Sequence, residues 1–388
     1  MRATTTRIDE APPSGRRLRV ALATLGCKVN QYDTATMETA LRERCEIVPF
    51  DTGADVYVVN SCTVTDRADA ESRQLARRAR RLNPSGRVIL TGCFAQTSPQ
   101  RAALPEVDYV IGVGRLPDLL RAVYDQIPQN DGRILVHDLR RAEQVSTLGA
   151  EVFGGQTRAF LKVQEGCDLF CTFCIVPFAR GRSRSVEPRR VLAELERLAA
   201  RGFREVVLTG IHLGGYGKDL TSALTLTDLL EMIAEVSPVP RIRLSSIDPP
   251  EINPRLLALV AGSGVFCPHF HVFPYSRRSG TTAAKLGGHL PPQTVAARAR
   301  ALRRVGAAKR RAFAERFVGA ELDVLVETTR DRETGRLVGY SRNYARVLLD
   351  GPDTLGNTEV RVRAVARHGD RLLAVGAPAD RAGHERAV

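Results

Sequence analysis

Three cysteines, Cys167, Cys171 and Cys174, lie within eight residues of one another with the spacing Cys-x3-Cys-x2-Cys. The apolar run at 160–163 precedes them and predicts a short strand that ends at the first cysteine. Three thiolates on one loop can hold three irons of a four-iron, four-sulfur cluster and leave the fourth iron open to a small molecule. Structural zinc is a weaker alternative, because no nearby His or Cys supplies a fourth ligand. A disulfide is weaker still, because three is odd and the loop is short.

Three further cysteines follow predicted strands in the N-terminal part of the chain. Strands and helices alternate from Leu18 onward, which predicts an α/β domain with a parallel sheet covered on both faces. Cys27 follows the first predicted strand, Cys62 the third and Cys93 the fourth. Because open α/β sheets gather ligands at the carboxyl ends of their strands, we expect these three cysteines to meet at one edge of the sheet.

The same three cysteines could instead be ordinary buried residues, since Cys is often buried. A buried cysteine should lie in the middle of a strand, whereas these three lie at loop tips, next to Gly26, Ser61 and Gly92. Ordinary burial explains Cys45 and Cys267 better, and the sequence assigns no role to those two.

Composition limits the class of protein. The 388 residues suffice for two or three domains, and a hydrophobic content of 43% indicates a globular chain. The polar segment 1–17 lacks the apolar core of a signal peptide, and no apolar run approaches the roughly 20 residues that span a bilayer. Eight cysteines without a secretion signal favour metal or redox chemistry, so we expect a cytoplasmic protein with no membrane contact.

The charge balance favours a partner with a phosphate backbone. The formal net charge is +14 at pH 7. A composition bias of the genome could explain why arginine replaces lysine almost everywhere, but it does not explain the excess of cations. We therefore expect binding to nucleic acid.

The loop at 165–174 resembles the radical S-adenosylmethionine (radical SAM) superfamily, which has this cysteine spacing and an aromatic residue, here Phe173, before the third cysteine. The resemblance implies that the open iron chelates S-adenosyl-L-methionine. One electron from the cluster then breaks a carbon–sulfur bond and releases a 5′-deoxyadenosyl radical. The protein supplies binding, orientation and exclusion of side reactions.

The segments 25–33, 60–64 and 91–96 resemble the N-terminal domain of the methylthiotransferase family within that superfamily. In this family, cysteines at the positions of Cys27, Cys62 and Cys93 bind a second cluster, whose open iron carries the sulfur to be inserted. The resemblance thus implies two 4Fe-4S clusters. The sequence at 28–32 is similar to that of the family branch whose members act on N6-threonylcarbamoyladenosine beside the tRNA anticodon.

Two loop tips and one basic run complete the expected radical domain. The resemblance implies that Gly210, after the strand at 205–209, and Ser246, after the strand at 241–246, help to bind S-adenosylmethionine. Arg180 and Arg182 belong to a basic run at 179–185 that could bind RNA phosphates or could be a solvated loop.

The predicted radical domain is short. Relatives carry a partial barrel of six βα units, whereas only four convincing strands occur between 158 and 316. The segment 267–271 matches the family's fourth strand and 272–277 matches its sixth, so about two units are expected to be absent. The active site is then either rebuilt or impaired.

Short alternating strands between 319 and 376 predict a small β-barrel. The run 338–344 resembles the TRAM domain, an OB-like module that binds RNA. Arg342 and Tyr344 offer a cation and a stacking face for RNA, although tyrosines here could also pack in the barrel.

The expected organisation has six parts. They are a tail (1–17), the N-terminal methylthiotransferase domain (18–141), a linker (142–157), the radical SAM domain (158–318), the TRAM domain (319–376) and a second tail (377–388).

The expected function is a tRNA methylthiotransferase that places a methylthio group at C2 of N6-threonylcarbamoyladenosine. An electron donor such as a flavodoxin or ferredoxin is implied. The alternatives are a ribosomal-protein methylthiotransferase of the same family and a catalytically impaired iron–sulfur protein that binds RNA.

Overall fold

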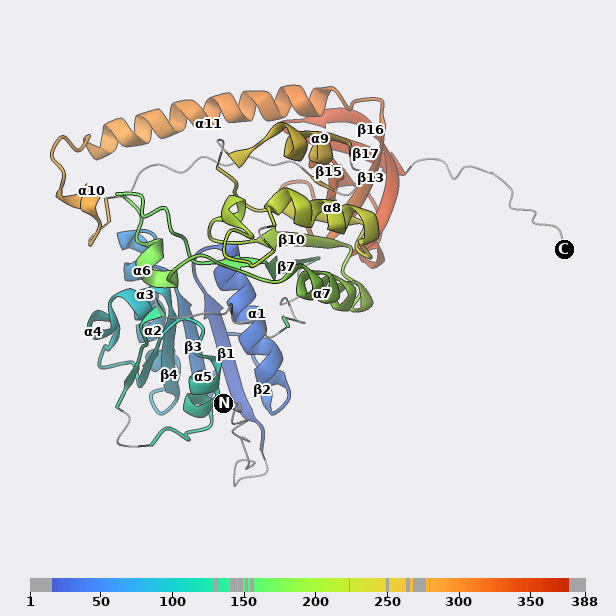
Figure 1. Ribbon diagram of the computed structural model, residues 1–388. Coiled ribbons are helices and arrows are strands. Elements are labelled where there is room, and N and C mark those ends of the chain that lie inside the picture. Colours follow the sequence, from blue (N-terminus) through green and yellow to red (C-terminus); the bar gives the residue numbers. More distant parts are fainter. Residues whose placement is uncertain are drawn as a thin grey trace.

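The computed structural model describes residues 16–128, 132–139, 145, 149–150, 153, 157–222, 224–248, 251–262, 266–267, 277–278 and 280–376. Three parts follow one another along the chain: a parallel sheet with helices, a second parallel sheet with helices, and a closed β-barrel (Figure 1). This arrangement confirms the fold class expected from the sequence.

The N-terminal part is a parallel sheet of six strands in the order β2-β1-β3-β4-β5-β6. Each strand pairs in parallel with its neighbours, and β3 is buried along its whole length. The strands are β1 (Leu18–Thr24), β2 (Cys45–Ile47), β3 (Val56–Ser61), β4 (Arg87–Gly92), β5 (Tyr109–Ile111) and β6 (Ile134–Leu135). The helices are α1 (Lys28–Arg42), α2 (Asp66–Leu82), α3 (Cys93–Thr97), α4 (Pro99–Ala102) and α5 (Leu116–Val123).

Helix α2 begins and ends at residues whose local sequence favours a helix start and a helix stop. The Thr65 side chain accepts a hydrogen bond from the Ala68 N–H, which caps the helix start. Asp66 lies in the first turn and Arg81 in the last, where each charge complements the helix dipole. Helix α1, by contrast, begins at Lys28 after an N-cap residue, Cys27, that makes no side-chain hydrogen bond to the helix.

The second part contains four parallel strands in the order β12-β11-β10-β7 within the described residues. The four strands match the expected number; of the segment at 267–271 that matches the family's fourth strand, only Cys267 lies in the described part. The strands are β7 (Arg158–Lys162), β10 (Glu205–Thr209), β11 (Arg241–Leu244) and β12 (Phe266–Cys267), beside a small antiparallel pair, β8 (Gln164–Glu165) and β9 (Arg184–Ser185). The helices are α6 (Val176–Arg180), α7 (Pro188–Ala200), η3 (Leu213–Gly215), α8 (Leu226–Val236) and α9 (Pro254–Gly262).

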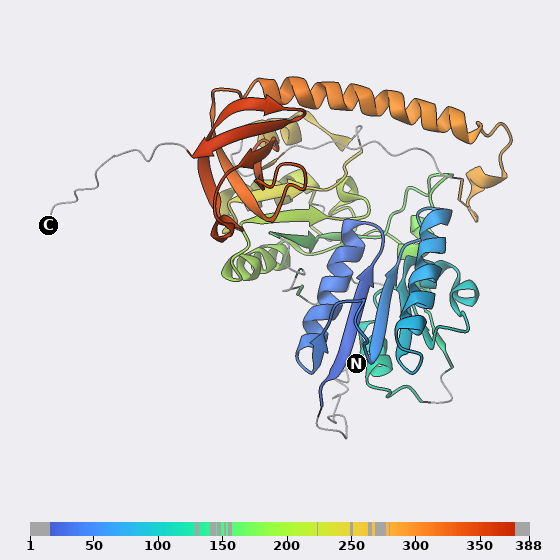
Figure 2. The same ribbon diagram turned by 180° about the vertical axis from the view of Figure 1, so that it is seen from behind.

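The C-terminal part confirms the expected small barrel. Its strands close in the order β13-β14-β15-β17-β16 around an apolar interior. Figure 2 shows these strands from behind. The strands are β13 (Glu321–Arg330), β14 (Leu337–Ser341), β15 (Arg346–Leu349), β16 (Glu359–His368) and β17 (Arg371–Gly376), with the short helix η5 (Asp353–Leu355) between β15 and β16.

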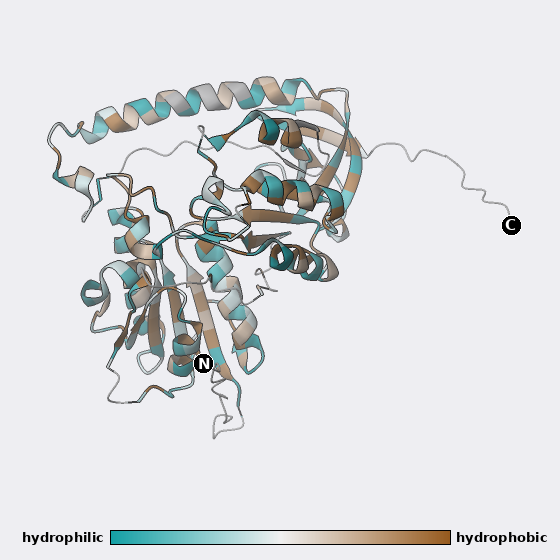
Figure 3. Ribbon diagram, in the orientation of Figure 1, coloured by the Kyte–Doolittle hydropathy of each residue, from teal (hydrophilic) through white to brown (hydrophobic). Residues whose placement is uncertain are grey.

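Two helices connect the second sheet to the barrel. They are α10 (Thr282–Lys285) and the long α11 (Pro292–Glu315), which crosses one side of the molecule in Figure 1. Hydropathy colouring shows apolar residues along the strands of both sheets, whereas α11 is mixed in character (Figure 3). No helix in the described part of the chain is both long and apolar enough to cross a membrane.

The domains share packing. Tyr32 and Ala35 of α1 belong to the same apolar core as Phe160 and Leu161 of β7, so α1 lies between the two sheets. The barrel is attached through a buried arginine, Arg241, whose Nη2 donates to the carbonyl oxygens of Tyr340 and Ser341, each at 2.8 Å.

Candidate functional site

The strand register brings the N-terminal cysteines to one level at the carboxyl edge of the first sheet. Strands β1, β3 and β4 are neighbours, with Thr24 opposite Asn60 and Ser61 opposite Gly92. Cys62 and Cys93 therefore leave adjacent strands side by side, and Cys27 leaves the third strand next to them. The three thiols are close enough for the charges of Cys27 and Cys62 to act on Cys93.

Gly26 allows the first and second of these cysteines to approach each other. Its φ is +99°, in the left-handed region that favours glycine. A Cβ atom at this position would lie 2.7 Å from Cys62 Sγ. Any other residue at position 26 would therefore be strained and would collide with a candidate ligand.

Burial at this site differs from what the sequence indicated. Cys27 is exposed, but Cys62 and Cys93 are only 5% and 7% exposed, and Cys93 is the first residue of α3 rather than part of a loop tip. Burial raises the pKa of the Cys93 thiol to about 12, although Arg180 acts in the opposite direction. Such a thiol gives up its proton near neutral pH when a metal binds the thiolate, which fits a cluster ligand.

The second set of cysteines lies on one loop between β8 and α6. The Cys167 N–H donates to the Gly181 carbonyl at 3.1 Å, and the Cys174 N–H donates to the Cys171 carbonyl at 2.9 Å. Cys171 is exposed, while Cys167 and Cys174 are partly buried. Burial raises the pKa of both partly buried thiols; a backbone hydrogen bond to each thiol acts in the opposite direction, and the neighbouring thiols raise the pKa further.

The surface of this second loop is apolar. Its large hydrophobic side chains are each more than half exposed, as is one from the adjacent helix α6. They are Leu169, Phe170, Phe173 and Phe178.

The spacing of the sulfur atoms distinguishes a cluster from a single zinc ion. Within the described residues, His212, Asp248 and Glu251 are the only three groups of metal-binding type whose ligand atoms all lie within 4.8 Å of one another. In neither cysteine set do all three sulfurs lie within 4.8 Å of one another, whereas one zinc ion at ~2.3 Å from each sulfur would bring all three within ~4.6 Å. A four-iron cluster binds each thiolate to a different iron, so both donor sets fit that group better.

A buried glutamine, which sequence reasoning missed, joins the cysteine loop to the second strand of its sheet. Gln164 Nε2 donates to the Gly166 carbonyl at 2.7 Å and to Ser183 Oγ at 3.0 Å, while its Oε1 accepts from the His212 N–H at 2.8 Å. Its Oε1 also lies 2.9 Å from the place where a Cβ of Gly210 would be. Gly210 therefore lies directly beside the loop of Cys167, and Ser246 is exposed after the adjacent strand β11.

Arg180 requires a correction. The basic run at 179–185 suggested a phosphate contact, but Arg180 is completely buried. Its Nη1 binds Asp33 and Glu165, each at 2.6 Å; its Nη2 donates to Asn30; and its Nε lies 3.3 Å from Cys93 Sγ. The side chain thus faces the N-terminal cysteine site and is not available to RNA.

A second buried arginine, Arg278, holds the backbone that follows Cys62. Its Nε donates to the Thr63 carbonyl at 2.6 Å, its Nη1 to Asp66 at 2.6 Å, and its Nη2 lies 3.1 Å from Asp69. No local sequence signal indicates this role, because the partners of Arg278 lie more than 200 residues away.

The other expected RNA contacts have different environments. The Arg182 side chain is 67% exposed. Arg342 pairs with Glu359 at 3.0 Å and Tyr344 stacks on Tyr340 at 4.8 Å, while Arg243 lies over the Tyr344 ring. Arg342 and Tyr344 therefore contribute to the contact between the barrel and the radical domain, and both remain partly accessible to solvent.

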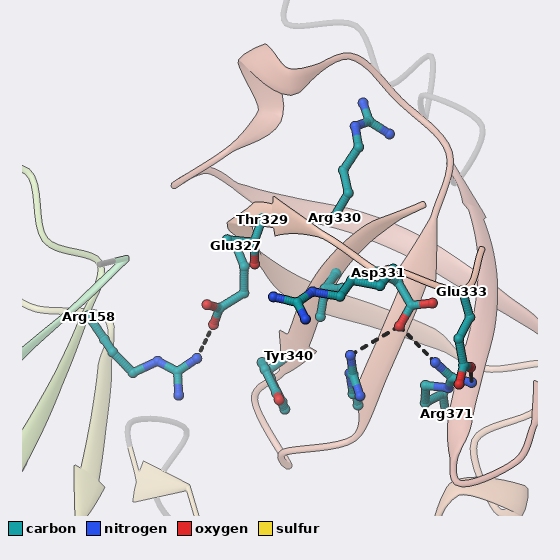
Figure 4. Close-up of a pocket in the computed structure, with 11 residues that line it drawn as sticks. Arg158, Glu327, Thr329, Arg330, Asp331, Glu333, Tyr340 and Arg371 are labelled. Carbon is teal, nitrogen blue, oxygen red and sulfur yellow. Dashed lines mark hydrogen bonds and ion pairs between the residues drawn. The ribbon is translucent and has the colours of Figure 1, made fainter. Parts of the chain in front are cut away.

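An open pocket of about 530 Å³ lies between the barrel and the edge of β7 (Figure 4). Asp331 binds Arg346 at 3.2 Å and Arg371 at 2.7 Å, and Arg158 binds Glu327. Arg330 and Arg332 also line the pocket, so five arginines face three carboxylates there.

Comparison with known proteins agrees with this organisation. Residues 19–112 match the family described as "Uncharacterized protein family UPF0004", and residues 161–312 match the radical SAM superfamily. The MtaB threonylcarbamoyladenosine tRNA methylthiotransferase of Aquifex aeolicus is 32% identical over 412 residues, which cover 87% of this chain and 98% of the relative. The enzyme of the same name from Bacillus subtilis is 31% identical, covering 89% of this chain and 93% of the relative.

The length of these alignments is itself informative. Both extend over more positions than the 388 residues of this chain, so the relatives carry residues that have no counterpart here.

A solved structure of the radical S-adenosylmethionine methyltransferase TsrM from Kitasatospora setae, with cobalamin and a 4Fe-4S cluster bound, is 18% identical with a TM-score of 0.46, covering 75% of this chain and 68% of that one.

Two family matches in the expected order, and relatives above 30% identity aligned over nearly their whole length, agree with the two cysteine sites and the barrel. The chain belongs to the radical SAM methylthiotransferase family, whose members are enzymes that transfer sulfur-containing groups and depend on an iron–sulfur cluster and S-adenosylmethionine.

Proposed function

We propose that this protein methylthiolates tRNA at C2 of N6-threonylcarbamoyladenosine beside the anticodon. The observation that carries the proposal is the presence of two separate three-cysteine sites, each of which offers three sulfur donors to a cluster. Two open clusters suit a reaction that needs both a radical and a sulfur atom. The names of the relatives support the choice of tRNA as the substrate and of N6-threonylcarbamoyladenosine as the modified nucleoside.

In this proposal, Cys167, Cys171 and Cys174 hold the radical cluster, and Cys27, Cys62 and Cys93 hold the auxiliary cluster. When bound, the clusters and S-adenosylmethionine supply the radical, the sulfur and the methyl group. The chain's own contribution is orientation. Gln164 fixes the cysteine loop against the Gly210 tip, and Gly210 and Ser246 border the space beside it in which S-adenosylmethionine would bind.

The iron content tests the two-cluster part of the proposal. Anaerobically reconstituted protein should contain about eight irons per chain if both clusters have four. Changing Cys167, Cys171 and Cys174 together to alanine should remove about half of the iron and all cleavage of S-adenosylmethionine. Changing Cys27, Cys62 and Cys93 should also remove about half, but cleavage should remain. Unchanged iron in either variant would refute the assignment.

The net charge of +14 supports binding to the phosphates of tRNA. Arg182, which is largely exposed, is the proposed contact next to the radical site, and Arg342 and Tyr344 are the proposed contacts on the barrel. Affinity for tRNA should fall steeply with salt, because phosphate contacts release counterions. Arg182→Gln should weaken binding without changing the iron content, and binding that does not depend on salt would contradict the proposal. A flavodoxin or ferredoxin is the proposed electron donor.

The short radical domain favours a second candidate, an impaired iron–sulfur protein that binds RNA. Four strands form a more open wall than six, and a radical enzyme must exclude water and bulk solutes. We expect cluster assembly with slow turnover and an excess of 5′-deoxyadenosine over methylthiolated tRNA. The two products should be measured together under anaerobic, reducing conditions. A ratio near one would show that the short domain closes its site.

A further inference from the structure

One buried side chain connects the two cysteine sites. Arg180 is the last residue of α6, just after the loop of Cys167, Cys171 and Cys174. It contacts Cys93 of the N-terminal site with Nε at 3.3 Å from the sulfur, and it also binds Glu165, two residues before Cys167. The same guanidinium therefore contacts a candidate ligand of one site and a side chain from the segment that leads into the other.

The surrounding charges are balanced without the thiolate. Two cations, Arg180 and Lys162, face two carboxylates, Asp33 and Glu165, and Lys162 Nζ lies 2.7 Å from each carboxylate. These four side chains are buried or nearly so. A third cation, Arg184, also acts on Glu165 and is matched by a third carboxylate, Asp219. Arg180 therefore offers the Cys93 sulfur a directed N–H group rather than a surplus positive charge.

We propose that Arg180 is a positioning residue that donates a hydrogen bond from Nε to the cluster-bound thiolate of Cys93 and thereby raises the reduction potential of the auxiliary cluster. This inference rests on the proposed function, because it requires a cluster on Cys27, Cys62 and Cys93.

The physical reason is electrostatic. Adding one electron to the cluster makes its sulfurs more negative, and an N–H group that points at a ligand sulfur stabilises the reduced form. The effect is strong in a buried site, where the local dielectric constant is low. Arg180 suits this role because its guanidinium does not lose its proton and because its three nitrogens are rigidly spaced. Asp33, Glu165 and Asn30 hold Nη1 and Nη2, so Nε stays aimed at Cys93.

The test uses full-length protein in which Cys167, Cys171 and Cys174 are alanine, so that only the auxiliary cluster is titrated. Its midpoint potential is measured anaerobically with dithionite as the one-electron reductant, with redox mediators and detection by electron paramagnetic resonance. Arg180→Lys keeps the positive charge but loses the planar set of N–H donors of the guanidinium, and Arg180→Gln loses both the charge and that set of donors. Arg182→Lys and Arg182→Gln are matched controls at an exposed arginine in the same run.

We expect Arg180→Lys to lower the reduction equilibrium constant at least tenfold, which is about 59 mV for one electron. Arg180→Gln should lower it further, and the Arg182 variants should not change it. If Arg180→Gln does not fold, Arg180→Lys still decides the question, because it preserves the charge balance. An unchanged potential in Arg180→Lys would overturn the role of Arg180 alone. Absence of any cluster in the parent with Arg180 intact would overturn the two-cluster proposal and this inference with it.

Discussion

The two cysteine sites are built in opposite ways. Cys167, Cys171 and Cys174 lie on one loop, and their spacing along the chain brings them together. Cys27, Cys62 and Cys93 lie at the ends of three strands, and only the pairing of β1, β3 and β4 brings them together. The first site is a local structure, whereas the second requires the whole N-terminal sheet.

Burial follows the same division. Each site has one exposed cysteine, Cys171 or Cys27, but the local site also has a surface of exposed aromatic side chains, including Phe170 and Phe173. The N-terminal site has two nearly buried cysteines and is held from the second domain by Arg180 and Arg278. A site that must be open to a cofactor can be made from a loop, whereas a site within the fold needs support from distant residues.

The largest expected effect comes from the glycines that precede the cysteines. Gly166 has a φ of +72°, and a Cβ there would collide with the Arg182 carbonyl. Gly166→Ala should therefore remove iron from the radical site alone, and Gly26→Ala should remove iron from the auxiliary site alone. The measurement is the iron content, together with cleavage of S-adenosylmethionine.

Gly202→Ala is the matched control for these two variants. Gly202 has a similar φ of +86°, but nothing lies within 4 Å of its Cβ position. It should cost only the backbone strain of about 1–3 kcal/mol and leave both sites filled. Loss of both sites in Gly26→Ala or Gly166→Ala would show that the two sites are not independent.

A smaller effect is expected from Arg278, which supports only the N-terminal site. Arg278→Gln removes the nearer of the two cations that pair with the buried carboxylate of Asp69 and leaves Arg101 at 3.7 Å, which should cost up to about 3–5 kcal/mol. We expect faster loss of auxiliary iron, measured in a variant whose radical-site cysteines are alanine. Iron at the radical site, measured with the opposite triple variant, should not change. Equal loss of iron from both sites would show that Arg278 does not support the N-terminal site alone.

A variant at the barrel contact should affect stability without affecting either site. Glu205 is buried between Arg241 at 3.0 Å and Arg243 at 2.5 Å. Burial alone would raise the pKa of Glu205, but the neighbouring arginines lower it below its usual range. Because the folded-state pKa is lowered, ionised Glu205 stabilises the fold above its ordinary pKa of 4.5, and this contribution is lost as the pH falls through the lowered value.

Glu205→Gln should therefore destabilise the protein by about 3–5 kcal/mol near neutral pH, and the difference should shrink below about pH 4.5. Unfolding by urea at a series of pH values, monitored on iron-free protein, measures this directly. A difference that stays constant from pH 7 to pH 3 would show that the carboxylate charge is not the cause.

The smallest effect concerns access from solvent. Cys171 is exposed, whereas Cys62 and Cys93 are not. In the two single-site variants, an iron chelator should bleach the radical site several times faster than the auxiliary site, because an open ligand is reached first. The absorbance of each cluster against time gives the two rates. The order should reverse if the exposed Cys27 controls access to the auxiliary site.

The sequence alone determined the features that depend on neighbouring residues. Helix α2 is correct at both ends because Thr65, the first-turn acids and the Asn83-Pro84 stop are all local signals. The loop spacing identified the radical site as a candidate, and the alternation of strands and helices predicted that Cys27, Cys62 and Cys93 would lie at one sheet edge. The barrel was predicted from short strands with polar turns.

Tertiary structure decided which charged residues are buried. Arg180 and Arg182 belong to the same basic run, yet one is enclosed by Asp33, Glu165 and Cys93 while the other faces solvent. Nothing in the run distinguishes them, because the groups that enclose Arg180 come from α1, β8 and α3. A buried charge is stable only when partners from distant segments meet it, and a sequence does not state where those segments meet.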